Sequence, residues 1–236
     1  MSEFVDAAQP RYDFVANLIA ADFPPPAKLI KLGTAPGHQI AQLASRGYEA
    51  VSIDLGAAED DWGSGGPGRF RGLLAETGVT HLEWDLEKVP YPLDDASFDV
   101  AVMTEVLEHL REYPSRSLSE ILRILHPGGR LYLTTPNAAY LVNRLKLLVG
   151  GSVHTRLEDW IGGLPHARHA REYTFGEIRV LLEHVGFRMV SEQSCHFYLG
   201  SGRTTVASMA VKHVLAVLAR LRKSFGPSII VVAERP

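Results

Sequence analysis

Short apolar segments alternate along the chain with stretches in which apolar side chains recur at helical spacing. The apolar segments predict seven strands, at residues 27–33, 50–54, 79–84, 98–103, 129–134, 187–194 and 228–233. The helical stretches lie at residues 12–20, 38–46, 70–77, 117–125, 137–149, 174–185 and about 205–223. Strands that alternate with helices are typical of βαβ units. We therefore predict an α/β fold with a seven-stranded, mostly parallel sheet and helices on both faces.

The composition is that of a folded globular protein. Of the 236 residues, 46% are hydrophobic and 22% are charged, so a packed core is expected and disorder of the whole chain is excluded. The net charge of -3 disfavours a dedicated nucleic-acid binder, which usually presents a basic face. Cys195 is the single cysteine, which excludes an internal disulfide and a cysteine zinc cluster. Residues 1–10 do not resemble a signal peptide and no apolar run reaches about 18 residues, so we expect no membrane span and a cytoplasmic protein.

Three predicted strands end in residues that suit a nucleotide ligand. In parallel sheets, ligands bind beyond the carboxyl ends of the strands. Residues 33–37, which contain two glycines, follow the first strand and open a helix, so their backbone can approach a ligand closely. Asp54 ends the second strand about 20 residues later, where nucleotide-binding βαβ folds place a ribose-binding acid, and Asp85 follows the third. Each feature alone is as well explained by a turn or a solvated loop, but the three together predict a nucleotide site.

Short motifs follow one another along the chain: LGTAPG (32–37), VSID (51–54), WDL (84–86), PLDDASFD (92–99), VLEHL (106–110), LHPGGR (125–130) and TTPN (134–137). In order and spacing, they resemble the class I S-adenosylmethionine-dependent methyltransferases. The resemblance extends over about residues 27–233 and implies a Rossmann-like sheet in a single domain, residues 1–236. Within this domain we expect residues 1–26 to form a helical lid. Residues 137–173 are too long for a plain connection and are expected to cap the acceptor pocket.

S-adenosylmethionine is the cofactor that the resemblance implies. The residues expected to bind it are Gly33, Thr34, Ala35 and Gly37 beneath the methionine part, Asp54 and Leu55 at the ribose, Asp85 and Leu86 at the adenine, and Thr104 and Glu105 near the sulfonium. The family usually has an acid two residues before the first glycine and a further glycine within the loop, where this chain has Lys31 and Ala35. Because that acid helps to hold the methionine amine, we expect this contact to be made differently or to be weaker. A dinucleotide dehydrogenase matches less well, because no third glycine stands near Ile40.

Glu105, Glu108 and His109 form the most informative polar cluster. On a helix, their spacing would place all three side chains on one face, directly after the fourth strand. With the later histidines, the cluster resembles the metal-dependent small-RNA 2′-O-methyltransferases. That resemblance maps Glu105, Glu108, His109 and His169 onto ligands of Mg²⁺ or Mn²⁺, with His166 as a rival for the fourth place. The VLEHL motif also occurs in metal-free class I methyltransferases, in which its acid and histidine are structural or face the substrate.

The same cluster favours transfer of a methyl group to oxygen. An aliphatic hydroxyl is a poor nucleophile near neutral pH, and a bound cation lowers the pKa of an oxygen that it coordinates. A histidine near neutrality can take the proton. We therefore expect Glu105, His166 and His169 to be catalytic, with the histidine that does not bind a cation acting as the base.

The expected acceptor is a saccharide or another sugar-containing molecule, such as a precursor of a methylmannose polysaccharide. A vicinal diol on a sugar can chelate a cation, and Trp62, Trp160, Tyr140 and Tyr173 are candidates for stacking on sugar rings, although core packing is the commoner use of aromatic residues. RNA, a quinone, phenol or lipid precursor, and an inactive cofactor-binding partner subunit are alternatives. The predicted helix at about 205–223 is expected to pack in the core or to form a homodimer.

Overall fold

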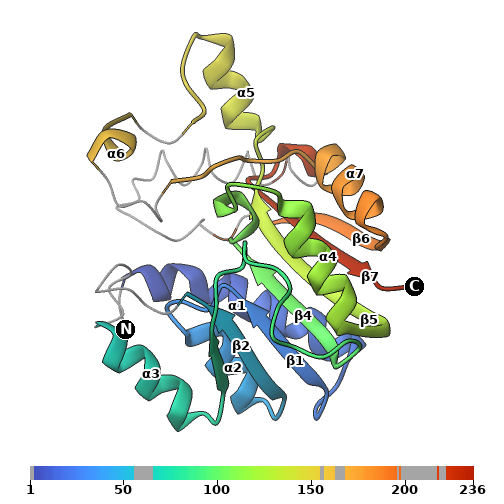
Figure 1. Ribbon diagram of the computed structural model, residues 1–236. Coiled ribbons are helices and arrows are strands. Elements are labelled where there is room, and N and C mark those ends of the chain that lie inside the picture. Colours follow the sequence, from blue (N-terminus) through green and yellow to red (C-terminus); the bar gives the residue numbers. More distant parts are fainter. Residues whose placement is uncertain are drawn as a thin grey trace.

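The computed structural model describes residues 3–55, 66–154, 157–162, 168–195, 197, 217 and 222–236. Its centre is a seven-stranded sheet in the order β3-β2-β1-β4-β5-β7-β6 (Figure 1). The strands are β1 Lys28–Leu32, β2 Glu49–Asp54, β3 Thr80–Glu83, β4 Phe98–Thr104, β5 Leu125–Pro136, β6 Arg188–Cys195 and β7 Ser228–Glu234. The pairs from β3 to β5 are parallel, whereas β7 runs antiparallel to β5 and β6. The predicted α/β fold with a seven-stranded, mostly parallel sheet is confirmed.

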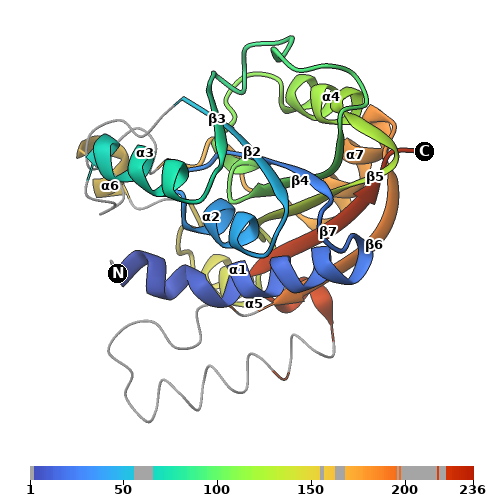
Figure 2. The same ribbon diagram turned by 90° about the horizontal axis from the view of Figure 1, so that it is seen from below.

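Helices cover both faces of the sheet (Figures 1 and 2). They are α1 Glu3–Asp22, α2 His38–Ser45, α3 Gly66–Glu76, α4 Pro114–Ile124, α5 Leu141–Leu148, α6 Leu157–Gly162 and α7 Phe175–Val185, with 3-10 turns η1 Leu107–His109 and η3 Lys223–Phe225. Helices α1, α2 and α3 pack on the face where β4 buries Val100 and Val102, and α4 and α7 on the face where it buries Ala101 and Met103. Because side chains alternate across a strand, β4 contributes to both cores. Among the described residues, no helix combines the length and apolar character needed to cross a membrane.

Helix α7 begins and ends where the sequence predicts. The side chain of Thr174 accepts from the backbone N–H of Glu177, and the Glu177 side chain accepts from the N–H of Thr174, which together form a capping box. The helix ends at Gly186, whose φ of 111° lies in the left-handed region that favours glycine. The capping box thus fixes the start of α7 directly after the histidine-containing segment, and Gly186 fixes its end.

Several other elements differ from their expected bounds. Helix α1 is longer than the expected residues 12–20, and the pattern does not predict α6 at all. Strand β5 begins at Leu125 rather than at residue 129, because Leu125 pairs with Phe98 across an irregularity in the ladder. The helix expected at about 205–223 lies outside the described residues, apart from positions 217, 222 and 223.

Candidate functional site

The loop of residues 33–37 joins β1 to α2 at the carboxyl edge of the sheet. Gly33 and Gly37 have φ angles of 69° and 92°, which only glycine adopts without strain. Oδ2 of Asp54, at the end of β2, accepts hydrogen bonds from the N–H of Thr34 and, at 2.9 Å, from the N–H of Ala35. Asp54 therefore holds the loop in place.

We expect Gly33→Ala to lower the free energy of unfolding by about 2–4 kcal/mol. A Cβ at this position would lie 2.2 Å from Cγ2 of Val106, and the φ of 69° would strain an alanine. Urea denaturation followed by circular dichroism measures the change. Gly72→Ala in the middle of α3 is the control, because a Cβ there meets nothing within 4 Å and alanine favours a helix. Equal stability of Gly33→Ala and wild type would contradict the close contact with Val106.

The residues expected at the ribose and adenine differ in their exposure. Leu55 follows Asp54 with a side chain that is 64% exposed. Leu86 is buried, and its carbonyl accepts from the hydroxyls of Tyr91 at 3.0 Å and Ser117 at 2.8 Å. Asp85 is half-buried, and its Oδ1 accepts from the backbone N–H two residues later at 2.9 Å. The turn after β3 is thus fixed by its own hydrogen bonds.

Lys31 lies buried beneath the glycine loop. Its Nζ donates to the carbonyl of Gly33 at 2.6 Å and to Oγ1 of Thr104 at 3.1 Å. The Thr104 hydroxyl donates in turn to Oε1 of Gln39 at 2.6 Å. Burial lowers the pKa of Lys31 to about 7, and the Asp54 carboxylate opposes this shift. Sequence reasoning missed Gln39, whose one signal is that it is a polar residue among the buried positions of α2.

Glu105 does not share a helical face with Glu108 and His109, so that expectation is wrong. The chain after β4 forms a single 3-10 turn, η1, and Glu105 precedes it with a left-handed φ of 54°. Its N–H donates to the carbonyl of Thr134 at 2.9 Å, and its Oε1 accepts from the Thr134 hydroxyl at 2.8 Å. Its Oε2 pairs with Nη1 of Arg11 from helix α1 at 3.4 Å. Sequence reasoning missed Arg11, because nothing in the local pattern of α1 points to this ion pair.

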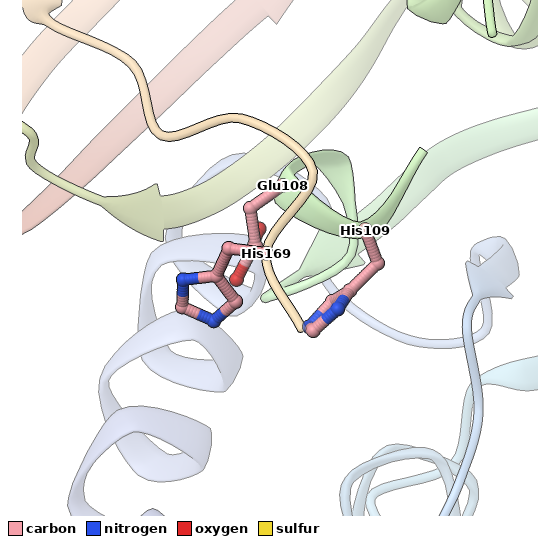
Figure 3. Close-up of side chains that lie close together, drawn as sticks. All are labelled: Glu108, His109 and His169. Carbon is pink, nitrogen blue, oxygen red and sulfur yellow. The ribbon is translucent and has the colours of Figure 1, made fainter. Parts of the chain in front are cut away.

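Glu108, His109 and His169 come together beside the carboxyl end of β4, and Figure 3 shows all three side chains in one place. One potential ligand atom from each lies within 4.8 Å of the other two. Glu108 and His109 belong to η1, whereas His169 comes from the segment before α7. Three of the four expected metal ligands are therefore adjacent, and Glu105 is not part of this group. His166 lies outside the described residues, so its expected roles stay predictions.

The segment that carries His169 is fastened to η1 through its backbone. The N–H groups of Ala170 and Arg171 both donate to the carbonyl of Glu108, at 2.7 and 3.2 Å. The rings of His109 and His169 meet edge to face with centroids 5.0 Å apart. Two segments distant in sequence are thus held in fixed register at the cluster.

Hydrogen bonds also set the orientation of both imidazoles. Nδ1 of His109 lies 3.1 Å from the carbonyl oxygen of Arg168, and Nδ1 of His169 lies 2.9 Å from Oε1 of Glu172. Both partners are acceptors, so Nδ1 carries the proton in the neutral rings and Nε2 carries the lone pair. Metal-binding histidines are commonly oriented by a carbonyl or carboxylate in this way.

Glu108 is a buried acid with a side chain that is 1% exposed. Its Oε2 accepts from the hydroxyl of Thr135 at 3.0 Å. Burial, and to a lesser extent the nearby Glu105, raises the pKa of Glu108 well above its usual value. A buried carboxylate is costly when charged unless a cation or several donors compensate it. The arrangement is thus suited to a bound cation.

The aromatic residues expected to stack on a sugar are only partly placed. Tyr173 is buried in the core around Ile178, which contradicts a stacking role for it. Tyr140 is half-buried at the start of α5. Trp62 and the side chain of Trp160 lie outside the described part of the structure.

Comparisons with known proteins find similar methyltransferases. A family model described as "Methyltransferase domain" matches residues 6–192. The chain is 31% identical over 122 residues to a protein of Mycolicibacterium smegmatis named "Probable S-adenosylmethionine-dependent methyltransferase". This match covers 52% of this chain and 39% of that protein. It is 29% identical over 106 residues to a demethylmenaquinone methyltransferase of Clavibacter sepedonicus, covering 45% of this chain and 40% of that one. The matches thus span less than half the length of these relatives.

A solved structure shares the whole fold. An S-adenosylmethionine-dependent methyltransferase from Mesorhizobium loti superposes with a TM-score of 0.65 at 20% sequence identity. The superposition covers 97% of this chain and 98% of that one. The likeness therefore extends to both halves of the sheet.

Proposed function

The chain belongs to the class I S-adenosylmethionine-dependent methyltransferases, and on this premise we propose that it methylates a hydroxyl group of a saccharide with the help of a divalent cation. The observation that carries the proposal is the convergence of Glu108, His109 and His169, with ligand atoms within 4.8 Å of one another. The cluster lies beyond the carboxyl end of β4, the edge at which ligands of parallel sheets bind.

The cofactor fits the residues of the loop. The positive φ angles of Gly33 and Gly37 are features of a loop whose backbone can approach a ligand closely. The hydroxyl of Thr34 is buried and has no hydrogen-bond partner among the described residues, so it is available to a ligand. We infer that Gly33, Thr34, Ala35 and Gly37 lie beneath the methionine part, as in the family. Asp54 and Leu55, Asp85 and Leu86, and Thr104 and Glu105 remain our assignments for the ribose, the adenine and the sulfonium.

The donor set also fits a cation. Two imidazoles oriented through Nδ1 and one buried carboxylate would hold a divalent ion, and the cation would offset the cost of burying Glu108. Imidazole ligands favour Mn²⁺ over Mg²⁺. When bound, the ion would lower the pKa of a hydroxyl oxygen.

The chemistry then requires a base and a fixed acceptor. A new bond forms from the acceptor oxygen to the methyl carbon, the bond from that carbon to sulfur breaks, and the hydroxyl proton passes to a base. His169 is a cation ligand in this assignment, so His166 is the base. Thr134 and Arg11 hold Glu105 in place, and we assign its negative charge the role of facing the sulfonium. Positioning of this kind supplies most of the rate for a donor that is already activated.

A saccharide acceptor suits the cation, because a vicinal diol offers two oxygens to one ion. We place it beneath residues 137–173, whose helices α5 and α6 stand away from the sheet (Figure 1). A second candidate has its own support: an apolar acceptor such as a quinone or lipid precursor. The side chains of Leu148, Val149 and Ile161 on and beside these helices are 81%, 85% and 75% exposed, and demethylmenaquinone methyltransferase is among the similar proteins.

Isothermal titration of Mn²⁺ and Mg²⁺ into chelator-treated protein tests the cation site. We expect one site per chain, tighter for Mn²⁺, that Glu108→Gln abolishes and Glu112→Gln leaves unchanged. Glu112 is the control because it follows the same 3-10 turn with an exposed side chain. Absence of a cation site in the wild-type protein would overturn the metal-assisted mechanism.

Transfer of a labelled methyl group separates the two acceptors. Label appearing in oligosaccharides with vicinal diols, and lost on chelation, supports the saccharide. Label appearing in a demethylated quinone without any cation would replace it with the apolar acceptor.

A further inference from the structure

The buried network around Lys31 contains polar atoms that the protein itself does not satisfy. Nε2 of Gln39 and Oγ1 of Thr34 are buried and have no hydrogen-bond partner among the described residues. Their residues are 2% and 1% exposed. Buried polar groups are nearly always paired, and an unpaired one destabilises the fold. Two such atoms at the loop assigned to the cofactor indicate that a group of the ligand forms hydrogen bonds with them.

The hydrogen bonds around Lys31 show whether that missing group is a donor or an acceptor. The Thr104 hydroxyl accepts from Lys31, so its own proton goes to Oε1 of Gln39. This fixes the Gln39 amide with its NH₂ group as the unpaired end, which can only donate. Lys31 has three N–H donors, of which Gly33 and Thr104 take two. The missing group is therefore an acceptor.

The charge of Lys31 also favours an acceptor. An ammonium stands where the family usually has an acid, and the nearest charges that act on it are Asp54, Arg11 and Glu105. Each of the two acids has its own partners: Asp54 accepts from the loop, and Glu105 pairs with Arg11. A carboxylate beside Lys31 would be attracted by its ammonium, whereas a second ammonium at the same place would be repelled by it.

We propose that Lys31 and Gln39 bind the carboxylate of the amino-acid end of S-adenosylmethionine, so that this chain recognises the acid of that end where the family usually recognises the amine. The inference rests on the cofactor of the family and does not depend on the acceptor or the cation. The position of Lys31 is consistent with this proposal, because its Nζ donates to the carbonyl of Gly33 in the loop assigned to the methionine part. The Thr34 hydroxyl is a third contact from that loop.

Binding of three ligands to the wild-type protein tests the polarity. The probes are S-adenosylhomocysteine, its analogue without the carboxylate (S-adenosyl-3-thiopropylamine) and its analogue without the amine (S-adenosyl-4-thiobutyrate). By isothermal titration we expect loss of the carboxylate to weaken binding about ten- to hundredfold, as for a charged hydrogen bond, and loss of the amine to weaken it less than about threefold. The opposite order would overturn the inference.

Variants of Lys31 and Gln39 test whether these residues cause the preference for the carboxylate. In Lys31→Met, S-adenosylhomocysteine and the analogue without the carboxylate are expected to bind within about threefold of each other. Gln39→Leu keeps the ammonium of Lys31 and is expected to reduce the difference between the two ligands without abolishing it. A role limited to packing would weaken both ligands equally and keep their ratio, which would overturn the assignment. Gln42→Leu, one turn further along α2 and bonded to Asp13, is the control that keeps the wild-type ratio. Failure of the wild-type protein to bind S-adenosylhomocysteine at all would remove the cofactor premise, and the inference with it.

Discussion

Glu108→Gln is expected to lower the rate of methyl transfer by about two to three orders of magnitude and to leave the affinity for S-adenosylhomocysteine within about twofold. Glutamine keeps the shape of the side chain and an oxygen that can accept from Thr135. It loses the charge that a divalent cation needs. Because the cluster lies after β4 and the glycine loop after β1, we assign methyl transfer and cofactor binding to different residues. Single-turnover transfer of labelled methyl and isothermal titration measure them separately.

His169→Asn extends the same test to the second segment. Asparagine can keep a donor toward Glu172 in place of Nδ1, but it has no counterpart of Nε2. We expect a loss of rate similar to that of Glu108→Gln. Asp54→Ala should behave in the opposite way, with a large loss of cofactor affinity, because its carboxylate holds the loop at Thr34 and Ala35. If Glu108→Gln or His169→Asn weakened S-adenosylhomocysteine as much as Asp54→Ala does, this division of the site would be wrong.

The sheet could be predicted from the sequence because its strands are buried on both faces. Such strands are continuous apolar runs, as in the VAVM segment of β4, and their order along the chain gives the alternation with helices. The places where strands end then locate Asp54, Asp85 and the glycine loop. Helix α7 was equally predictable, because its capping box and its terminal Gly186 are local signals.

The geometry of Glu105 could not be predicted in this way. The spacing argument assumes a helix after β4, and the chain instead turns through a left-handed residue held by Thr134 on the neighbouring strand. Arg11 reaches the same carboxylate from the first helix. Contacts between segments that are distant in sequence determine this conformation, and these contacts cannot be predicted from local periodicity. His169 was assigned to the cluster through the family resemblance, and in the structure backbone bonds to the carbonyl of Glu108 bring its segment to η1.

Lys31→Met is expected to raise the free energy of unfolding at pH 6 by about 2–3 kcal/mol, although it removes hydrogen bonds. Burial lowers the pKa of Lys31 from 10.5 to about 7 in the folded protein, a difference that corresponds to roughly 5 kcal/mol. Loss of the donors to Gly33 and Thr104 offsets about half of this. The thermal midpoint should rise by about 5–10 °C.

The sign of the pH dependence distinguishes this cause from better packing. Because the folded pKa is the lower one, the unfolded chain binds more protons between pH 7 and 10.5, and the wild-type protein gains stability as the pH rises through this range. The cost of burying the ammonium is complete below about pH 7, so the advantage of Lys31→Met should be largest at pH 6 and smaller at pH 9. Lys28→Met is the control: it begins the same strand, is exposed, and should change stability by less than about 1 kcal/mol at either pH.

A stabilising substitution at a buried position needs an explanation for the residue that nature keeps there. Proteins retain destabilising groups mainly where binding or catalysis requires them. Greater stability of Lys31→Met, together with the loss of its preference for the ligand carboxylate, would show that the lysine is held in the core for the cofactor. A loss of stability that is equal at pH 6 and pH 9 would instead make Lys31 a structural support of the loop, because its hydrogen bonds to Gly33 and Thr104 would then outweigh the cost of its burial.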